Sequence, residues 1–198
     1  MFEEINDVHI VGSAKELNTM ISAVDMIVQK MANTTEQVQG FVANLGSTTF
    51  GQQYENAVNA VSGLSDILYD KSTDLNRSQR DLVNYIDRVD IFNDRPPSSL
   101  PPRNFEVIRI NISVNTRDDR FTKETLQKLK SMLSTYCDVI SVQKLQLLNE
   151  KSSIGSIWKD SQYRVYSSFI DEICRAIENG TRALREYVEY LGIKIGQL

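Results

Sequence analysis

Apolar residues recur every three or four positions along most of this chain, a pattern typical of amphipathic helices that pack lengthwise. The first run is Leu17, Ile21, Val24, Val28, Met31, Thr35, Val38, Val42 and Leu45. The second run is Phe50, Tyr54, Ala57, Val61, Leu64, Leu68, Lys71, Leu75, Ser78, Leu82, Tyr85 and Val89. Lys71 and Ser78 are polar, so we expect the middle of the second helix to pack weakly or to face solvent.

The second half of the chain repeats the first with a constant offset. Adding 109 to Leu17, Leu64 or Leu82 gives Leu126, Ile173 and Leu191, and the same offset relates most apolar positions of the two halves. It also holds across the turns, where Leu45-Gly46-Ser47 matches Ile154-Gly155-Ser156 and Gln53-Tyr54 matches Gln162-Tyr163. Two unrelated helical stretches would rarely keep one offset across a turn, so the sequence predicts two tandem helical hairpins.

Each hairpin turn contains a glycine followed by hydroxyl residues and an aromatic residue. We expect Gly46 and Gly155 to end a helix in the left-handed conformation, and the following Ser or Thr to cap the next helix. Phe50 and Trp158 then enter that helix as large apolar side chains beside the turn. Together with Tyr54 and Tyr163 they form either a partner-binding patch or part of the core.

All four prolines lie within residues 93–104, which excludes a helix there and favours an extended linker. This linker divides the chain into a first hairpin at 1–92 and a second at 105–198. Residues 105–114 alternate, with Ile108, Ile110, Ile112 and Val114 on one side. They predict a half-buried strand or an extended segment lying along a groove.

A second short extended segment is predicted before the first hairpin, where Val8 and Ile10 alternate. The second hairpin is expected to start near Thr122 and Thr125, which resemble a helix cap.

The expected fold class is all-α. A helical hairpin buries one stripe on each helix, and two hairpins can cover each other as a four-helix bundle. Because one chain supplies both, we expect a monomeric pseudo-dimer. If the hairpins pack antiparallel, the linker must travel the length of the bundle, and its twelve residues reach roughly 37 Å.

Composition excludes several kinds of partner. The chain has 198 residues and a net charge of −4, so it has no general attraction to nucleic acid. No apolar run approaches the length of a membrane span. The N-terminal residues are acidic and lack the basic and apolar regions of a secretory signal peptide.

The sequence offers no constellation for catalysis, a metal or a cofactor, so we expect a non-enzymatic protein. His9 is the single histidine, and the acidic pairs Glu3-Glu4, Asp118-Asp119 and Asp171-Glu172 are expected to face solvent or to favour a helix start. Cys137 and Cys174 are expected to be buried thiols. They can form a disulfide only if their Cα atoms lie within about 7 Å.

Ile154-Gly155-Ser156-Ile157-Trp158-Lys159-Asp160 resembles the Trp-x-Gly turn of the WXG proteins of type VII (ESX-type) secretion, with Asp160 at the Gly position. In the first half Phe50 stands at the Trp position and Gln52 at the Gly position. The resemblance covers nearly the whole chain as two tandem copies. It implies a four-helix assembly of two hairpins that is exported by an FtsK-like ATPase without a signal peptide, or that targets other substrates to this machine.

The family's export signal, Tyr-x-x-x-Asp/Glu after the second helix, is absent: Tyr187 is followed by Leu191 at the fourth position, and Tyr190 by Lys194. This departure favours a partner or targeting factor, for example for an LXG-type toxin, over autonomous export. The protein would be cytoplasmic before export, and secreted or at the cell surface after it. The alternative function is an intracellular helical scaffold or regulator unrelated to secretion, with the 105–114 segment as a docking edge.

Overall fold

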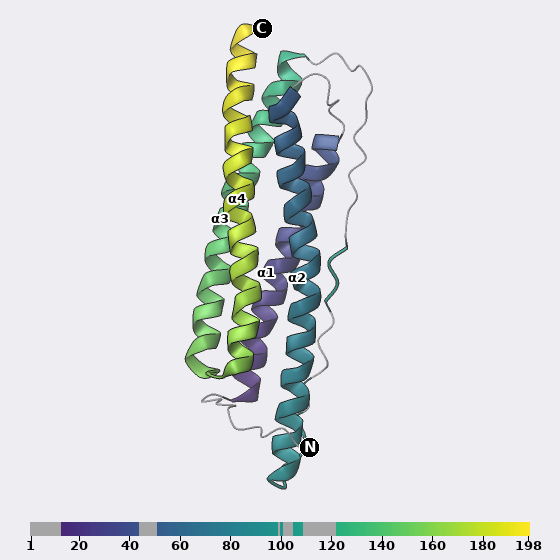
Figure 1. The fold of residues 1–198 in the computed structure, drawn as a ribbon, viewed down its shortest axis with the longest axis vertical. Helices are drawn as coiled ribbons and strands as arrows, with labels where there is room; N and C mark the ends of the chain where they lie inside the picture. Colours follow the sequence, from purple (N-terminus) through teal and green to yellow (C-terminus); the bar gives the residue numbers. More distant parts are fainter. Residues whose placement is uncertain (1–12, 44–50, 99, 101–104, 109–121) are drawn as a thin grey trace.

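The computed structural model describes residues 13–43, 51–98, 100, 105–108 and 122–198. They form four long helices and, within these ranges, no strand. The helices are α1 (Ala14–Ala43), α2 (Gly51–Phe92), α3 (Lys123–Ile157) and α4 (Ser161–Gln197). The predicted all-α four-helix bundle is confirmed (Figure 1).

Each helix packs against two others: α1 and α4 both contact α2 and α3, whereas the diagonal pairs have no Cα atoms within 8 Å of each other. Figure 1 shows that α1 and α4 run in one direction and that α2 and α3 run in the other. Every pair of neighbouring helices is therefore antiparallel. The end of α2 and the start of α3 lie at opposite ends of the bundle, so the connection between them spans its length, as the linker prediction requires.

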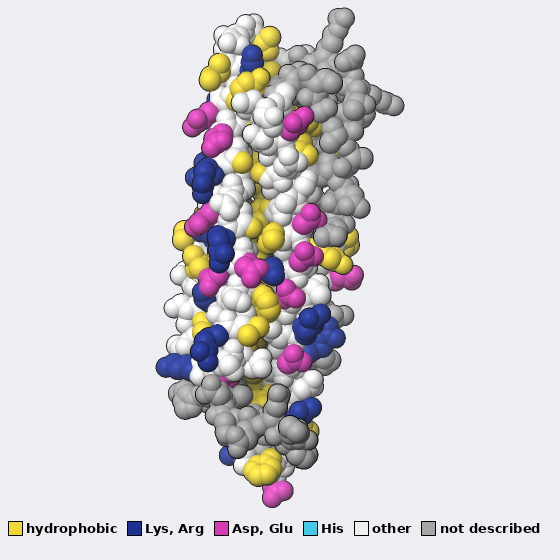
Figure 2. Space-filling model, in the orientation of Figure 1, with side chains coloured by type: hydrophobic (Ala, Val, Ile, Leu, Met, Phe, Trp, Pro, Cys, Tyr) yellow, Lys and Arg dark blue, Asp and Glu magenta, His cyan; other side chains and the backbone are white. Residues whose placement is uncertain are grey.

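The surface formed by α2 and α4 carries both signs of charge. Figure 2 shows acidic and basic side chains interspersed along these helices, with a narrow band of apolar side chains between them. A shallow groove of about 570 Å³ follows this band because small residues line it: Ala60, Gly63, Ala176, Gly180 and Ala183. A Cβ added at Gly180 would lie 3.6 Å from the carbonyl oxygen of Ala60, so the two helices approach closely here.

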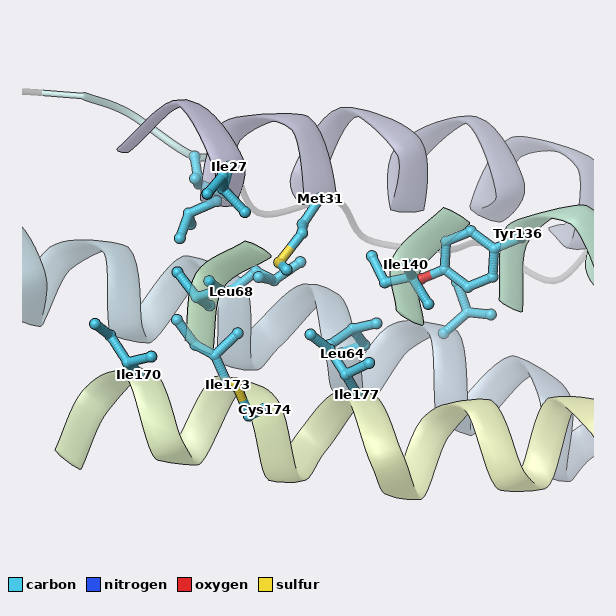
Figure 3. Packing of buried hydrophobic residues seen from close by; sticks show 14 of the residues in the cluster. Ile27, Met31, Leu64, Leu68, Tyr136, Ile140, Ile170, Ile173, Cys174 and Ile177 are labelled. Atoms are coloured by element: carbon cyan, nitrogen blue, oxygen red, sulfur yellow. The ribbon is translucent and has the colours of Figure 1, made fainter. Parts of the chain in front are cut away.

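The core is built from the predicted apolar runs of all four helices. In Figure 3, Met31 of α1, Leu68 of α2, Ile140 of α3 and Ile173 of α4 converge on the bundle axis. Positions related by the offset of 109 are buried alike. Such pairs include Val24 and Leu133, Met31 and Ile140, Leu68 and Ile177, and Leu75 and Leu184.

Lys71 connects two helices rather than weakening one. Its Nζ lies 3.1 Å from Asp74 and 2.8 Å from Glu172 of α4, and 5.3 Å from the centre of the Phe169 ring. Its hydrocarbon stem can therefore lie against the bundle while its charge is paired.

The buried polar side chains of α2 include Ser72, Asn76 and Gln79. Ser72 and Gln79 directly follow Lys71 and Ser78, the polar residues of the apolar run, and Asn76 follows Leu75. Gln79 donates a hydrogen bond of 2.8 Å to the Asp25 carboxylate of α1. The pattern of apolar positions therefore located the polar part of α2 correctly but missed which side chains are buried.

Residues 105–108, the docked segment, have no regular secondary structure. Asn76 donates from Nδ2 to the Phe105 carbonyl at 2.5 Å, and its Oδ1 accepts from the Phe105 N–H at 3.3 Å. Val107 is 3% exposed, whereas Ile108 is 73% exposed. The sequence placed Ile108 on the inner side, so that orientation is wrong. The remaining expected strand positions, 109–114 and 1–12, lie outside the described residues.

The second hairpin starts as predicted. Thr122 is the N-cap of α3, and its hydroxyl accepts a hydrogen bond of 3.2 Å from the Thr125 N–H.

Candidate partner-binding site at the second hairpin turn

The second turn comprises residues 158–160 and is closed by hydrogen bonds at both ends. Trp158 is the C-cap of α3, and its backbone N–H donates to the Ile154 carbonyl at 2.9 Å. Asp160 is the N-cap of α4, and its Oδ1 accepts from the Tyr163 N–H at 2.8 Å. A carboxylate at a helix N-cap also interacts favourably with the helix dipole.

Gly155 and Ser156 do not have the predicted roles. Both lie within α3, which continues to Ile157, and Gly51 is the glycine with positive φ, 56°, among those described. The Ser156 hydroxyl donates back to the Ser153 carbonyl at 2.6 Å instead of capping α4. The helix runs past Gly155 to its C-cap at Trp158, and Asp160 begins α4 two residues after that.

Gly155 is needed for a close side-chain approach. A Cβ at this position would lie 2.4 Å from the Tyr163 hydroxyl and 2.8 Å from its ring carbon Cζ. The Tyr163 hydroxyl donates to the Lys151 carbonyl at 2.9 Å, thereby connecting α4 to α3.

The first hairpin makes the same tyrosine contact. The Tyr54 hydroxyl donates to the Val42 carbonyl at 2.8 Å, and both residues lie 109 positions before their counterparts Tyr163 and Lys151. The matching Gln-Tyr of the two turns therefore marks a repeated connection between helices. Gly46 and Phe50 lie outside the described residues.

The aromatic candidates separate into two groups. Trp158 is 0% exposed, and its ring centre lies 5.7 Å from that of Tyr163 and 5.5 Å from that of Tyr166. Tyr54 is 1% exposed, and its ring centre lies 6.4 Å from that of Tyr187. Tyr187 is in the C-terminal part of α4, away from the second turn. The geometry favours core packing for Trp158 and Tyr54, and it places these two side chains against different parts of α4 rather than in one patch.

The end of α2 and the second turn enclose a cavity of about 340 Å³, the turn cavity. Its wall consists of Asp81, Leu82, Asn84, Tyr85 and Arg88 from α2, and Asp160 and Gln162 from the turn and the start of α4. No sequence motif marked the residues of α2. Antiparallel packing of the hairpins was the available signal, because it places the end of α2 beside the second turn.

Asp160 is the buried polar residue of the turn cavity. It is 5% exposed, and its Oδ2 has no hydrogen-bond partner among the described residues. Asp81, Asn84, Arg88 and Gln162 are exposed around it. The cavity thus combines a desolvated carboxylate with a polar, accessible rim, an arrangement suited to binding a hydrogen-bond donor rather than to acid–base catalysis.

The two cysteines are free and buried, so they form no disulfide. Burial raises the pKa of the Cys137 and Cys174 thiols to about 11. Both are therefore protonated and poorly nucleophilic at neutral pH. Within the described ranges, no three His, Cys, Asp or Glu side chains come together as metal ligands.

The fold defines a class, a tandem pair of antiparallel helical hairpins that form one bundle. Comparisons of the chain with protein-family models, curated proteins and solved structures found no match. Among the helices described here, none has the length and apolarity that a membrane crossing requires.

Proposed function

We propose that this chain is a non-enzymatic protein of a type VII (ESX-like) secretion system, acting through helical-bundle contacts as a substrate or as a partner that targets other substrates. The observation that carries the proposal is the antiparallel pairing of two hairpins within one chain, with a Trp-containing turn on the second. This is the assembly implied by the resemblance of the 154–160 stretch to the WXG turn.

The departure from the Trp-x-Gly motif is compatible with this function. Asp160, at the Gly position, forms the N-cap of α4, so Trp158-Lys159-Asp160 still makes a compact turn. The neighbouring end of α2 belongs to the other hairpin. A partner that binds this end of the bundle would therefore contact both hairpins at once.

The alternative is an intracellular scaffold or regulator that uses residues 105–114 as a docking edge. Asn76 already pairs with both backbone polar groups of Phe105, which leaves that residue unavailable for pairing with another strand. This contact weakens the alternative at the described start of the segment.

The first experiment is an immunoblot of cells and medium from the native host, with and without its FtsK-like ATPase, combined with recovery of the tagged chain from both strains. We expect the protein in the medium, or a co-purifying secretion partner, when the ATPase is present and not when it is absent. Retention in cells of both strains with the same co-purifying proteins would refute the secretion function.

Two matched charge-reversal variants test whether the partner recognises the turn or the surface in general. Lys159 lies on the exposed part of the turn, and Lys128 is exposed on α3. We expect Lys159→Glu to change ATPase-dependent recovery and Lys128→Glu to leave it unchanged. Both variants should keep the free energy of unfolding within about 0.5 kcal/mol of the parent, as surface substitutions usually do. Equal changes for both variants would argue against recognition at the turn.

A further inference from the structure

We propose that the turn cavity is a receptor for an arginine side chain presented by a protein partner. This inference rests on the proposed function for the existence of a partner, and it adds the chemistry by which the partner is recognised.

The shape and lining of the cavity fit a long side chain with a polar end. The cavity measures about 340 Å³, and Leu82 and Tyr85 contribute apolar surface to its wall. The aliphatic stem of an arginine can pack on such surface, and its planar guanidinium can stack on an aromatic ring. Asn84 and Gln162, also in the wall, supply amide oxygens that accept further N–H donors.

Asp160 supplies the specific requirement for a donor. Its Oδ1 is occupied by the helix cap, while its Oδ2 is buried without a hydrogen-bond partner in the described part of the chain. A buried acceptor that lacks a donor is costly, and the field of its charge is weakly screened by water. A cation in the cavity would interact favourably with this buried charge, and its N–H groups would donate to the acceptors exposed on the rim, those of Asp81, Asn84 and Gln162.

The charges of the cavity wall favour a cation over an anion. Asp81 and Asp160 contribute two negative charges and Arg88 contributes one positive charge, which leaves one negative charge. Arg88 is exposed, and it is the internal competitor for the two carboxylates because no other basic side chain lines the cavity. Its removal should therefore strengthen the binding of an added cation.

The test uses the full chain and a blocked tripeptide, acetyl-Ala-Arg-Ala-amide, as the probe. Side-chain and backbone amide signals of Asn84 and Gln162 are followed by NMR during the titration. We expect saturable shifts at millimolar peptide that weaken as sodium chloride is added. The same peptide with citrulline in place of arginine keeps the shape and loses the charge, and it should produce no saturable shift.

Four variants locate the site. Asp160→Asn keeps a good N-cap residue and removes the charge, and Asp81→Asn removes the carboxylate at the rim. We expect each substitution to raise the Kd of the tripeptide roughly tenfold, in line with the strength of charged hydrogen bonds. Arg88→Ala should bind more tightly, and Glu189→Gln, an exposed change elsewhere on α4, should bind as the parent does.

The proposal is overturned if citrulline and arginine peptides shift the same signals equally, or if a third peptide, acetyl-Ala-Lys-Ala-amide, binds as tightly as the arginine peptide. It is also overturned if both Asp variants bind like the parent, or if no saturable shift occurs. If Asp160→Asn fails to fold, Asp81→Asn on the exposed rim still decides the question. Failure of these titrations would leave the ATPase-dependent recovery of the chain as a separate result, so the two proposals can fail independently.

Discussion

Gly155 illustrates how a glycine can be required without any unusual backbone angle. It lies in regular helix, and the constraint comes from the Tyr163 ring, whose hydroxyl approaches to within 2.4 Å of where a Cβ would be. The ring is fixed in turn because that hydroxyl donates to the Lys151 carbonyl. A methyl group at residue 155 must therefore displace either the ring or α3.

We predict that Gly155→Ala destabilises the protein by about 1–3 kcal/mol, the usual cost of overpacking, despite the better helix propensity of alanine. Gly63→Ala is the matched control, because Gly63 also lies in a helix and a Cβ there would meet nothing within 4 Å. That variant should be neutral or more stable by up to about 1 kcal/mol. Urea unfolding of both variants provides the measurement.

A double-mutant cycle identifies the cause. Tyr163→Phe removes the hydroxyl nearest the new methyl group, so its cost should be smaller in the Gly155→Ala background than in the parent. Strictly additive costs would show that the destabilisation of Gly155→Ala has another origin.

The buried thiols predict a loss of stability in alkaline solution. Burial raises the pKa of Cys137 and Cys174 from 9.0 to about 11. The folded state therefore retains protons that the unfolded state releases. The resulting stabilisation is complete below pH 9 and is lost as the pH rises towards 11.

We expect the free energy of unfolding to fall across this window, and to fall less steeply in a Cys137→Ala/Cys174→Ala variant. Burial also raises the pKa of Tyr136, and the charge of the Cys137 thiolate adds to that shift. The difference between the two pH profiles therefore reports the thiols together with the effect of Cys137 on Tyr136. Identical slopes would mean that the thiols titrate as in the unfolded chain.

At the scale of elements, the second turn depends on Trp158 to hold α3 and α4 together. The side chain is fully buried and packs against Tyr163 and Tyr166 of α4. We predict that Trp158→Ala lowers the free energy of unfolding by about 3–5 kcal/mol, as for other large buried aromatics. Guanidinium chloride unfolding followed by circular dichroism measures the change.

Trp158→Phe, which keeps an apolar ring, should lower the free energy of unfolding by clearly less than Trp158→Ala does. A Trp158→Ala variant with parental stability and defective partner recovery would reverse the interpretation and make Trp158 a binding residue rather than a core residue.

The docked segment depends mainly on one side chain of α2. Asn76 forms hydrogen bonds with both backbone groups of Phe105, and Val107 is buried two residues later. We predict that Asn76→Ala speeds amide hydrogen exchange across residues 105–108 and costs about 1–3 kcal/mol, because buried polar groups lose their partners. Asn59→Ala, at an exposed position of α2, should change neither quantity. Unaltered exchange in Asn76→Ala would show that Val107 alone holds the segment.

The sequence predicts the helices and their inner faces well because apolar spacing and burial have the same physical cause. Val24 and Leu133, related by the offset of 109, are both completely buried. The orientation of the docked segment could not be predicted in this way. Alternation defines two sides but not which one faces inward, and the contacts that hold the segment, such as those of Phe105 with Asn76, join residues far apart in sequence.

The turn and its cavity show a second limit of the sequence. Gly155 looks like a helix terminator until the competing cap at Asp160 and the Tyr163 ring are known. Asp81 and Arg88 look like ordinary solvated charges on a helix. Their relation to Asp160 exists only after the hairpins pack, so no local pattern could reveal it.

At the scale of the whole molecule, each hairpin covers the apolar face of the other. Val61 of α2 and Ile170 of α4 are fully buried in the bundle, and a separated hairpin would expose such residues. We predict that fragments 1–98 and 99–198, produced separately, are poorly helical and combine into a 1:1 complex with restored helicity. Circular dichroism and light scattering of the mixture provide the measurement. Monomeric fragments with native helicity and no association would contradict this prediction.

The alternating direction of the four helices also has an electrostatic consequence. Each helix carries a partial positive charge at its N-terminus and a partial negative charge at its C-terminus. Because every helix is antiparallel to both neighbours, each end of the bundle presents two helix N-termini and two C-termini, and each N-terminus lies between two C-termini. The backbone dipoles therefore cancel along the bundle axis. At a distance from either end, a charged partner is therefore oriented by the side chains there and not by the backbone.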